Sequence, residues 1–425
     1  MGARWDGIPA DVFMDILQRV PASPRRRLRL VCRHWRDVID DRTRRRRRRH
    51  ARSNVLVFAG GLSLPRAYVL GGEEAGGKDL KLHGGVVDWD ATMVGSCNGL
   101  ICLHRYRGDA VVVNPATGEK LAVPPPSEAP GQSTDAASYS FAYHPATGLY
   151  KIVHVPCRGG GGAAFDAVSV FTLGDTSWRE VPVPAGTSCH LKFGIVSVGG
   201  ATYWVAADAH SLMSLDLKDE RVAFVTKLPV RVGLWLDLSW HLTTDMNGRL
   251  GLAVCSYEMK RTRTVKGCQT KVWMLEGGGK TKKTWALRYR IVEPGWEEPL
   301  HQIAWPYAVH GEHILTTRNK RGCESVSLHA SPMSEARAHC GVVRTEKCAP
   351  PPSVGLYDNC RSVRTFAHVE TREPLALYRC NDDDDDKIGD DGVEWSWKFD
   401  SEQGRWKLML HCSWLDLTRV VCSEC

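Results

Sequence analysis

Residues 110–123 read AVVVNPATGEKLAV, two short apolar segments joined by a turn. Valine is frequent in strands, and proline early in a turn with glycine at its end is typical of a tight hairpin loop. Nearly the same turn returns thirty residues later as HPATG at 144–148, between the apolar segments 140–143 and 150–155. Both stretches therefore predict antiparallel hairpins, and their recurrence indicates an architecture of repeated hairpins.

Further pairs of segments follow the same plan. Each has an apolar strand, a polar turn and a second strand that is often opened by Trp or another large residue. The predicted pairs are 168–173 with 178–181, 211–217 with 222–228, 271–275 with 284–291, and 393–399 with 406–410. This spacing predicts a mainly β fold, with a β-propeller of roughly six to eight blades over residues 94–425. A large β-sandwich is the alternative for the same strands.

The first forty residues have a helical pattern instead. Val12, Ile16 and Val20 recur at i, i+4 and i+8, and Pro21 then ends the predicted helix. A second apolar pattern at helical spacing follows over residues 28–39. Helices this short bury little surface on their own. Their apolar face is therefore expected either to dock on the rest of the chain as a helical cap or to be covered by a partner helix.

An ordered set of residues in this stretch resembles the F-box. The matching positions are Ile8-Pro9, Asp11, Ile16-Leu17, Val20-Pro21, Val31-Cys32, Trp35 and Val38-Ile39. Arg25-Arg26 departs from the family, which usually has two apolar residues there, and this weakens the apolar face of the middle helix. The resemblance implies binding to the Skp-type adaptor of Skp–cullin–F-box ubiquitin ligases. The side chains it assigns to adaptor binding are Ile8, Pro9, Val12, Ile16, Leu17, Val20, Pro21, Leu28, Leu30, Val31 and Trp35.

A second resemblance lies in the β-rich part. The segments GSCNGLIC at 95–102, NPATG at 114–118 and FAYHPATGLYKIV at 141–153 are similar to the F-box-associated domain of plant F-box proteins. The similarity continues through 199–204 and 215–217 and fades beyond about residue 291. In that family the domain resembles a kelch-type propeller and captures substrate.

The net charge of +8 is a local feature. Residues 1–53 hold sixteen Arg and six Asp, which gives +10 and leaves about −2 for the remainder. The large C-terminal part therefore has no electrostatic reason to bind nucleic acid. The run Arg44–Arg49 lacks interleaved aromatic side chains on which bases would stack. It is interpreted as a solvated linker, a nuclear-import signal or, least favoured, a nucleic-acid contact.

Several classes of protein are disfavoured by composition. No run of about 18 apolar residues is present, so no membrane span is expected. The N-terminus lacks the apolar core of a signal peptide. The fifteen cysteines are scattered and are therefore interpreted as reduced thiols of a protein in the nucleus and/or cytoplasm.

No catalytic or cofactor motif is present. The chain has no G-x-S-x-G elbow, no P-loop, no dinucleotide fingerprint and no H-E-x-x-H. Cys422 and Cys425 form one C-x-x-C, whereas a structural zinc site usually has two such pairs. The acidic run Asp382–Asp386 lacks the spacing of a calcium loop. We therefore expect no catalytic residue, no metal and no cofactor.

These observations predict three regions: an F-box at 5–41, a basic linker and lead-in at 42–93, and a propeller-like domain at 94–425. The function they predict is that of the substrate-recognition subunit of a Skp–cullin–F-box ubiquitin ligase. It would hold an unidentified protein substrate on the β domain and would not itself be an enzyme. The alternative is a propeller enzyme or small-ligand receptor with a site at the loop mouth.

Overall fold

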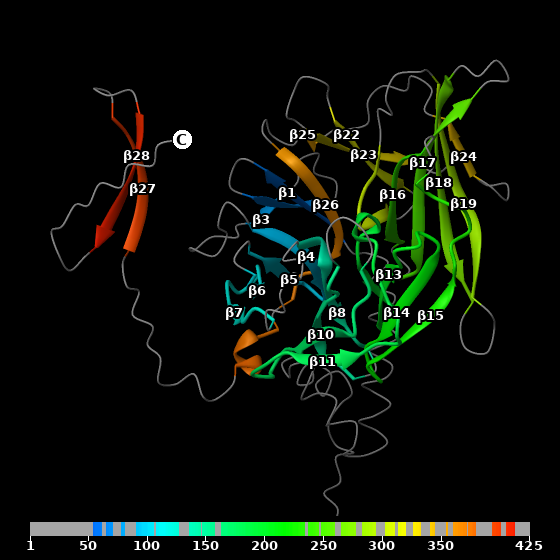
Figure 1. The fold of residues 1–425 in the computed structure, drawn as a ribbon. Coiled ribbons are helices and arrows are strands. Elements are labelled where there is room, and N and C mark those ends of the chain that lie inside the picture. The colour runs from blue at the N-terminus through cyan, green and yellow to red at the C-terminus, as the bar shows by residue number, and fades with distance from the viewer. Residues whose placement is uncertain are drawn as a thin grey trace, which may run out of the picture. The chain divides into compact units, whose positions relative to one another are not determined.

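The structure is a computed structural model. It describes residues 54–61, 65–70, 78–80, 91–105, 108–126, 136–145, 147–157, 163–233, 237–245, 248–259, 265–277, 283–294, 302–310, 313–319, 326–332, 341–344, 354–355, 360–371, 373–379, 393–400 and 405–412. The chain divides into two compact units, Met1–Tyr378 and Arg379–Cys425. In the described residues both are built mainly of β-strands (Figure 1).

Three consecutive antiparallel sheets of four strands form the first part of the larger unit. In each sheet, strands that are neighbours in sequence are neighbours in space. Their strands are β4 (Thr92–Cys97), β5 (Leu100–His104), β6 (Ala110–Val113) and β7 (Lys120–Val123); β8 (Tyr139–Tyr143), β9 (Tyr150–His154), β10 (Ala167–Thr172) and β11 (Arg179–Pro182); β12 (Val196–Val198), β13 (Ala201–Val205), β14 (Ser211–Asp216) and β15 (Arg221–Lys227). Short 3-10 helices precede the second and third sheets, η2 (Ala136–Ser138) and η3 (Leu191–Phe193). The hairpins predicted in this region are confirmed.

A ten-stranded sheet follows. Its strands are β16 (Asp237–Asp245), β17 (Leu250–Met259), β18 (Val265–Glu276), β19 (Thr284–Pro294), β20 (Gln302–Ile303), β21 (Tyr307–His310), β22 (His313–Asn319), β23 (Val326–Pro332), β24 (Gly341–Arg344) and β25 (Val354–Gly355). It contains two successive meanders, which merge because β16 pairs in parallel with β21. Together with the sheet that contains β1 (Asn54–Gly61) and β26 (Cys360–His368), the larger unit has five sheets in the described residues. The expected count of six to eight blades was too high.

The remaining sheet joins distant parts of the chain. Its order is β26 (Cys360–His368), β1 (Asn54–Gly61), β2 (Arg66–Leu70) and β3 (Lys78–Leu80). Strand β1 pairs with β26 from Asn54 opposite His368 to Gly61 opposite Cys360. The first three strands lie in the segment that was expected to be a lead-in. A 3-10 helix, η4 (Leu375–Tyr378), follows β26.

Six strands close a ring at the centre of these sheets. Strands β4, β8, β12, β16, β21 and β26 contact one another in that order, and β26 returns to β4. The ten-stranded sheet supplies two members of the ring, and each other sheet supplies one. This closed succession is a propeller-like arrangement, and it confirms the mainly β, propeller-like fold.

The core lies between neighbouring sheets, as expected for blades stacked around an axis. In the described residues, most clusters of buried apolar side chains draw from two successive sheets, and one lies between the two meanders of the ten-stranded sheet. Examples of such pairs are Leu100 and Phe141, Val153 and Trp204, and Leu212 and Leu252. Large side chains at these positions bury apolar area against both sheets at once, which fixes each sheet relative to the next.

The two NPATG-like turns share one geometry. The N–H of Gly118 donates to the Asn114 carbonyl at 2.8 Å, and the N–H of Gly148 donates to the His144 carbonyl at 2.8 Å. Both glycines have positive φ, 77° and 71°, a region that other residues adopt at a cost. The first side chain of each turn also accepts a backbone N–H, at Asn114 Oδ1 and at His144 Nδ1. Asn and His therefore fill equivalent capping positions.

The prediction that all cysteines are reduced thiols is wrong for Cys157 and Cys189. Cys157 and Cys189 form a disulfide, whereas all cysteines were interpreted as reduced thiols. Both are buried in the apolar cluster between the β8–β11 and β12–β15 sheets. Packing brings them together from 32 residues apart, a proximity that spacing does not reveal. Cys97, Cys102 and Cys255 are not joined in a disulfide with any residue that the structure describes.

The smaller unit contains a hairpin. Strand β27 (Val393–Asp400) pairs antiparallel with β28 (Arg405–Cys412), so the hairpin predicted over residues 393–410 is confirmed. In the part of the chain that the structure describes, no helix is long and apolar enough to cross a membrane.

Candidate functional site

The residues expected to bind the adaptor, from Ile8 to Trp35, lie outside the described residues. The same is true of the arginine run 44–49, the acidic run 382–386 and the pair Cys422 and Cys425. Adaptor binding therefore stays a prediction from sequence.

A buried carboxylate links the end of the larger unit to the β4–β7 and β8–β11 sheets. We call residues 373–378, which follow β26, the C-terminal strap. Glu373 in this strap is buried, and its two oxygens accept hydrogen bonds from the hydroxyls of Tyr150 at 2.8 Å and Tyr378 at 2.6 Å. Asn114 Nδ2 donates to the Glu373 carbonyl at 2.8 Å, and Asn98 Nδ2 donates to the Tyr150 hydroxyl at 3.2 Å. Three groups thus donate directly to Glu373, and a fourth, the Asn98 amide, donates to one of them.

The side chains that hold Glu373 come from the motif segments. Asn98 lies in the turn between β4 and β5, Asn114 begins the turn after β6, and Tyr150 begins β9. These are the three stretches whose residues resemble the F-box-associated domain. In the described residues these side chains hold the strap against two neighbouring sheets, β4–β7 and β8–β11.

The protonation of this cluster follows from its burial. Burial raises the pKa of Tyr150 well above its ordinary value, and the nearby charge of Glu373 adds to the shift. Burial and Glu373 raise the pKa of Tyr378 in the same direction. Both phenols therefore stay protonated at neutral pH and act as hydrogen-bond donors. Because both carboxylate oxygens are already engaged, the cluster works as a structural tie.

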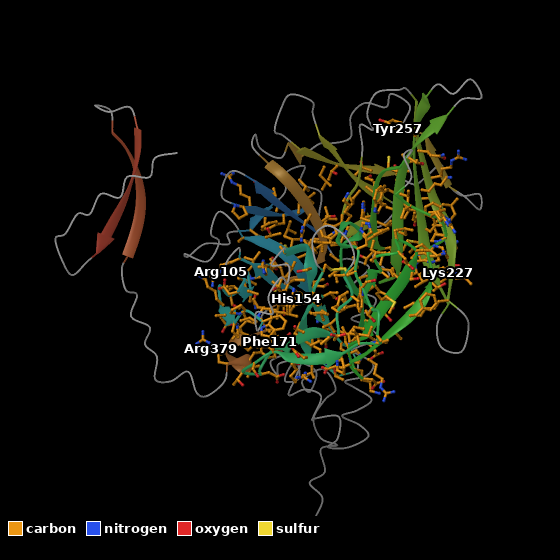
Figure 2. The ribbon with its side chains drawn as sticks, in the orientation of Figure 1. Arg105, His154, Phe171, Lys227, Tyr257 and Arg379 are labelled. Carbon is orange, nitrogen blue, oxygen red and sulfur yellow. A yellow bond between two sulfur atoms is a disulfide. The ribbon has the colours of Figure 1, made fainter. Side chains whose placement is uncertain are left out.

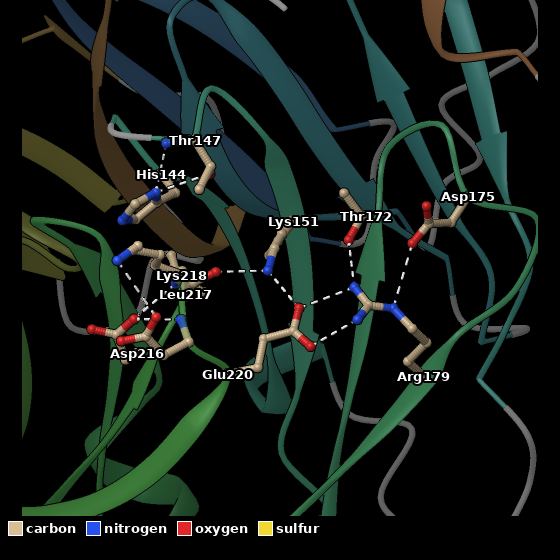
Figure 3. Close-up of polar contacts among 11 residues, drawn as sticks. His144, Thr147, Lys151, Thr172, Asp175, Arg179, Asp216, Leu217, Lys218 and Glu220 are labelled. Atoms are coloured by element: carbon tan, nitrogen blue, oxygen red, sulfur yellow. Dashed lines mark hydrogen bonds and ion pairs between the residues drawn. The ribbon is translucent and has the colours of Figure 1, made fainter.

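A second polar group connects the β8–β11 and β12–β15 sheets (Figure 3). Glu220, in the turn before β15, accepts hydrogen bonds from Lys151 Nζ and from Arg179 Nη1 and Nη2, the latter two at 2.8 and 3.0 Å. Lys151 is buried and also donates to the Leu217 carbonyl at 2.6 Å. Arg179 reaches Asp175 as well, at 3.5 Å. The carboxylate therefore neutralises a buried ammonium at the boundary between two sheets.

The pKa of Glu220 is lower than that of an ordinary glutamate. Burial acts to raise it, but the hydrogen bonds and charges of Lys151 and Arg179 outweigh burial and lower it. The group is ionised at neutral pH and stays ionised into mildly acidic conditions.

A third cluster lies where the ring closes. The guanidinium of Arg364 lies 4.4 Å from the ring centroid of Trp305 and donates to the Met93 carbonyl at 2.9 Å. Gly194, after η3, faces the other part of the indole, so that an added Cβ would lie 2.5 Å from Trp305 Cζ2. Thr365 donates its N–H to the Trp305 carbonyl at 2.9 Å. Trp305 itself lies between β20 and β21. Through these contacts it joins β26, the segment between η3 and β12 and, by way of Arg364, strand β4.

Among the described residues, no group of three or more His, Cys, Asp or Glu side chains could hold a metal ion. Phe224 on β15 and Leu377 in the strap are the exposed large hydrophobic residues of that set. Figure 2 shows side chains filling the spaces between the sheets of the larger unit.

Comparison with known families supplies the identity of the chain. The family described as the F-box associated beta propeller domain matches residues 79–328, which is more than half of the sequence. The chain belongs to this family. The F-box domain family matches residues 5–47 of the same F-box protein.

The relatives of this F-box protein are plant proteins. An F-box protein of Arabidopsis thaliana is 27% identical over 213 residues, covering 46% of this chain and 53% of the relative. An F-box/kelch-repeat protein of the same plant is 25% identical over 320 residues, covering 68% and 70%. For several of the relatives it matches, the chain spans only about half of their length. The chain is thus a plant F-box protein.

A comparison with solved structures adds no further argument. A structure from a study of two prolyl endopeptidases covers 88% of this chain and 57% of its own, with a TM-score of 0.30 and 11% identity. At that score the likeness supports no inference on activity.

Sequence reasoning missed the acid at the centre of the first cluster. Glu373, Thr365 and Arg364 all follow the end of the family match at residue 328. In this F-box protein, strand β26 and the strap that follows it therefore close a domain whose recognisable motifs end earlier. The signal that could have located Glu373 was the set of polar motif residues, Asn98, Asn114 and Tyr150, for which no partner had been assigned.

Proposed function

We propose that this F-box protein is the substrate-recognition subunit of a Skp–cullin–F-box ubiquitin ligase. The observation that carries the proposal is that one chain holds an F-box, at 5–47, and an F-box-associated propeller, at 79–328. The first would dock on the Skp-type adaptor and the second would hold a client protein. Families of this kind are generally not enzymes. The client's lysines would be modified because the receptor raises their local concentration near ubiquitin carried by other subunits.

Adaptor docking would use the apolar side of the N-terminal helices. Burial of a Val, Leu or Ile side chain contributes about 1.5–3 kcal/mol. Several of them, with Ile16 and Leu17 at the centre of the pattern, would suffice for a stable interface after association costs. Arg25 and Arg26 subtract apolar area from the middle helix, so the remaining apolar positions would have to provide the contact.

Co-purification with the adaptor tests this proposal. Ile16→Arg with Leu17→Arg places two charges in the apolar stripe and is expected to abolish adaptor binding. The matched control is Ile16→Leu with Leu17→Ile, which keeps the stripe apolar and is expected to bind normally. Circular dichroism and the urea midpoint of the β-domain should be the same in both variants. Normal co-purification of the arginine variant would refute the proposal.

The proposal includes action in the nucleus and/or cytoplasm. The arginine run 44–49 is the candidate import signal. A fluorescent fusion in plant cells, with these arginines replaced by glutamine, tests it. Loss of nuclear fluorescence would support import through the run, and an unchanged distribution would assign the run to a linker.

A further inference from the structure

The outer edges of the sheets differ in whether another strand covers them. In the ten-stranded sheet, β24 pairs with β19 and β25 pairs with β23, so the last strand of each meander receives an additional strand from this chain. In the three preceding sheets, β7, β11 and β15 end the sheet in the described residues. Strands β7 and β11 have four residues each, and β15 has seven. Strand β15 is therefore the longest uncovered outer strand of the larger unit in the described residues.

The side chains of β15 also set it apart. Phe224, in the middle of the strand, is 54% exposed, more than any other large hydrophobic residue described. Natural sheet edges are usually kept short or guarded by charges, because unpaired N–H and C=O groups recruit another strand. The centre of β15 carries no charge over residues 222–226. Its middle offers backbone groups and an apolar side chain beside a register shift in the pairing of β15 with β14.

Positive charges lie at the two ends of the same strand. Arg221 and Lys227 are exposed and form no ion pair with any residue that the structure describes. The nearby acids have other partners: Glu220 is bound by Lys151 and Arg179, Asp216 at the end of β14 accepts the N–H groups of Lys218 and Asp219, and Asp219 pairs with Lys218 at 3.7 Å. The strand edge is therefore complementary to a segment with acidic ends and an apolar centre.

We propose that the outer edge of β15 binds an extended segment of the client protein as an added strand. The backbone of that segment pairs with residues 221–226, because the Lys227 carbonyl already accepts the Trp285 Nε1–H at 2.9 Å. Its central apolar side chain packs on Phe224, and acidic side chains at its ends lie beside Arg221 and Lys227. The inference rests on the proposed receptor function and names the chemistry of its client.

A synthetic peptide tests the surface directly. The probe is fluorescein-labelled EVTLTVE, and the matched peptide KVTLTVK reverses only the end charges. Binding to the full chain in complex with its adaptor is followed by fluorescence anisotropy. We expect saturable 1:1 binding of EVTLTVE, and binding of KVTLTVK roughly tenfold weaker. Backbone hydrogen exchange should slow on peptide binding in β15 and not in β7 or β11.

Variants of β15 assign the binding energy. Phe224→Ala is expected to weaken EVTLTVE binding by about tenfold, as truncation of a central aromatic contact does. Leu377→Ala removes the other exposed large hydrophobic residue and is expected to change nothing. Arg221→Glu with Lys227→Glu should reverse the preference, so that KVTLTVK binds more tightly than EVTLTVE. All these side chains are exposed, so the variants should keep the unfolding midpoint of the parent.

The outcomes separate this inference from the receptor proposal. No saturable binding of EVTLTVE, equal binding by the Phe224→Ala variant, or exchange protection outside β15 would each overturn the added-strand site. Adaptor co-purification is measured on the same samples and depends on the N-terminal helices alone. A chain that binds the adaptor but not the peptide refutes only this inference, and one that binds the peptide but not the adaptor refutes only the ligase assignment.

Discussion

The Tyr150 hydroxyl donates a 2.8 Å hydrogen bond to Oε2 of Glu373, across 223 residues of sequence. Tyr150 is fully buried at the start of β9, and Glu373 is buried in the C-terminal strap. The second carboxylate oxygen accepts a hydrogen bond from the hydroxyl of Tyr378, the last residue of the 3-10 helix in the strap. One acid therefore fastens the end of the larger unit to the β8–β11 sheet.

Detachment of the strap would take the carboxylate acceptor away from the buried Tyr150 hydroxyl.

Removal of the acid should destabilise the larger unit. Glu373→Leu leaves the hydroxyls of Tyr150 and Tyr378 buried without their acceptor, at a cost of roughly 1–3 kcal/mol each. Tyr378→Phe removes one donor and is expected to cost about 1 kcal/mol. Urea unfolding of the full chain measures both. Leu377→Ala, an exposed change in the same 3-10 helix, is the control and should stay within about 0.5 kcal/mol of the parent. A Glu373→Leu midpoint equal to that control would contradict the structural role assigned to the acid.

The ion pairs of Glu220 predict a pH dependence. Its pKa in the folded chain lies below the ordinary glutamate value of 4.5. A carboxyl group with a depressed folded pKa stabilises the fold above its unfolded pKa, and this contribution is lost as the pH falls through the folded pKa. Glu220→Gln should therefore lower the urea midpoint at pH 7, and the difference from the parent should shrink as the pH is lowered below 4.5. Asp219→Asn, at an exposed neighbouring acid, is the control and should show little difference at either pH. A constant difference across this range would contradict the assignment.

The disulfide predicts a sensitivity to reductant. The bond between Cys157 and Cys189 closes a loop of 32 residues, for which the chain-entropy model gives about 3–4 kcal/mol. Reduction should lower the free energy of unfolding of the parent by that order. The variant Cys157→Ala with Cys189→Ala should start lower and no longer respond to reductant. Mass spectrometry of the unreduced chain after alkylation provides the check: two alkylated cysteines at these positions would show that the bond does not form.

The contact of Gly194 with Trp305 predicts a difference between two glycines. Gly194 and Gly186 both have positive φ, 71° and 78°. An added Cβ at Gly194 would lie 2.5 Å from the indole, whereas at Gly186 it would meet no atom within 4 Å. Gly186→Ala should therefore cost only the backbone strain, about 1 kcal/mol, and Gly194→Ala should cost clearly more, because the indole must move. Thermal unfolding of the two variants measures the difference. Equal midpoints would mean that Trp305 does not constrain this site.

The hairpins could be read from sequence because they depend on neighbours in the chain. Apolar segments flanking a turn with glycine at its end are enough to define a hairpin such as 110–123, and the positive φ of Gly118 shows why glycine is required there. The number of separate sheets could not be read in this way. The merger of two meanders depends on the parallel pairing of β16 with β21, strands separated by four others in the chain.

The same distinction, between local sequence pattern and tertiary contact, applies to the candidate sites. Asn98, Asn114 and Tyr150 lie in segments that the sequence marked, but their partner Glu373 lies in a stretch without a recognisable pattern. Phe224 lies in a strand that was predicted, yet its exposure depends on whether another strand covers the edge. Residue type alone does not show that Glu373 lies in a buried hydrogen-bonded cluster or that Phe224 lies exposed on a sheet edge.

The sequence by itself determined the strands, their turns and the family, because backbone preference, side-chain alternation and motif order are properties of short segments. Only the tertiary structure decided that β26 pairs with β1, that Cys157 meets Cys189, and that Glu373 lies under Tyr150. These contacts join segments far apart in the chain, and their energy comes from desolvation and geometry that exist only once the sheets have packed.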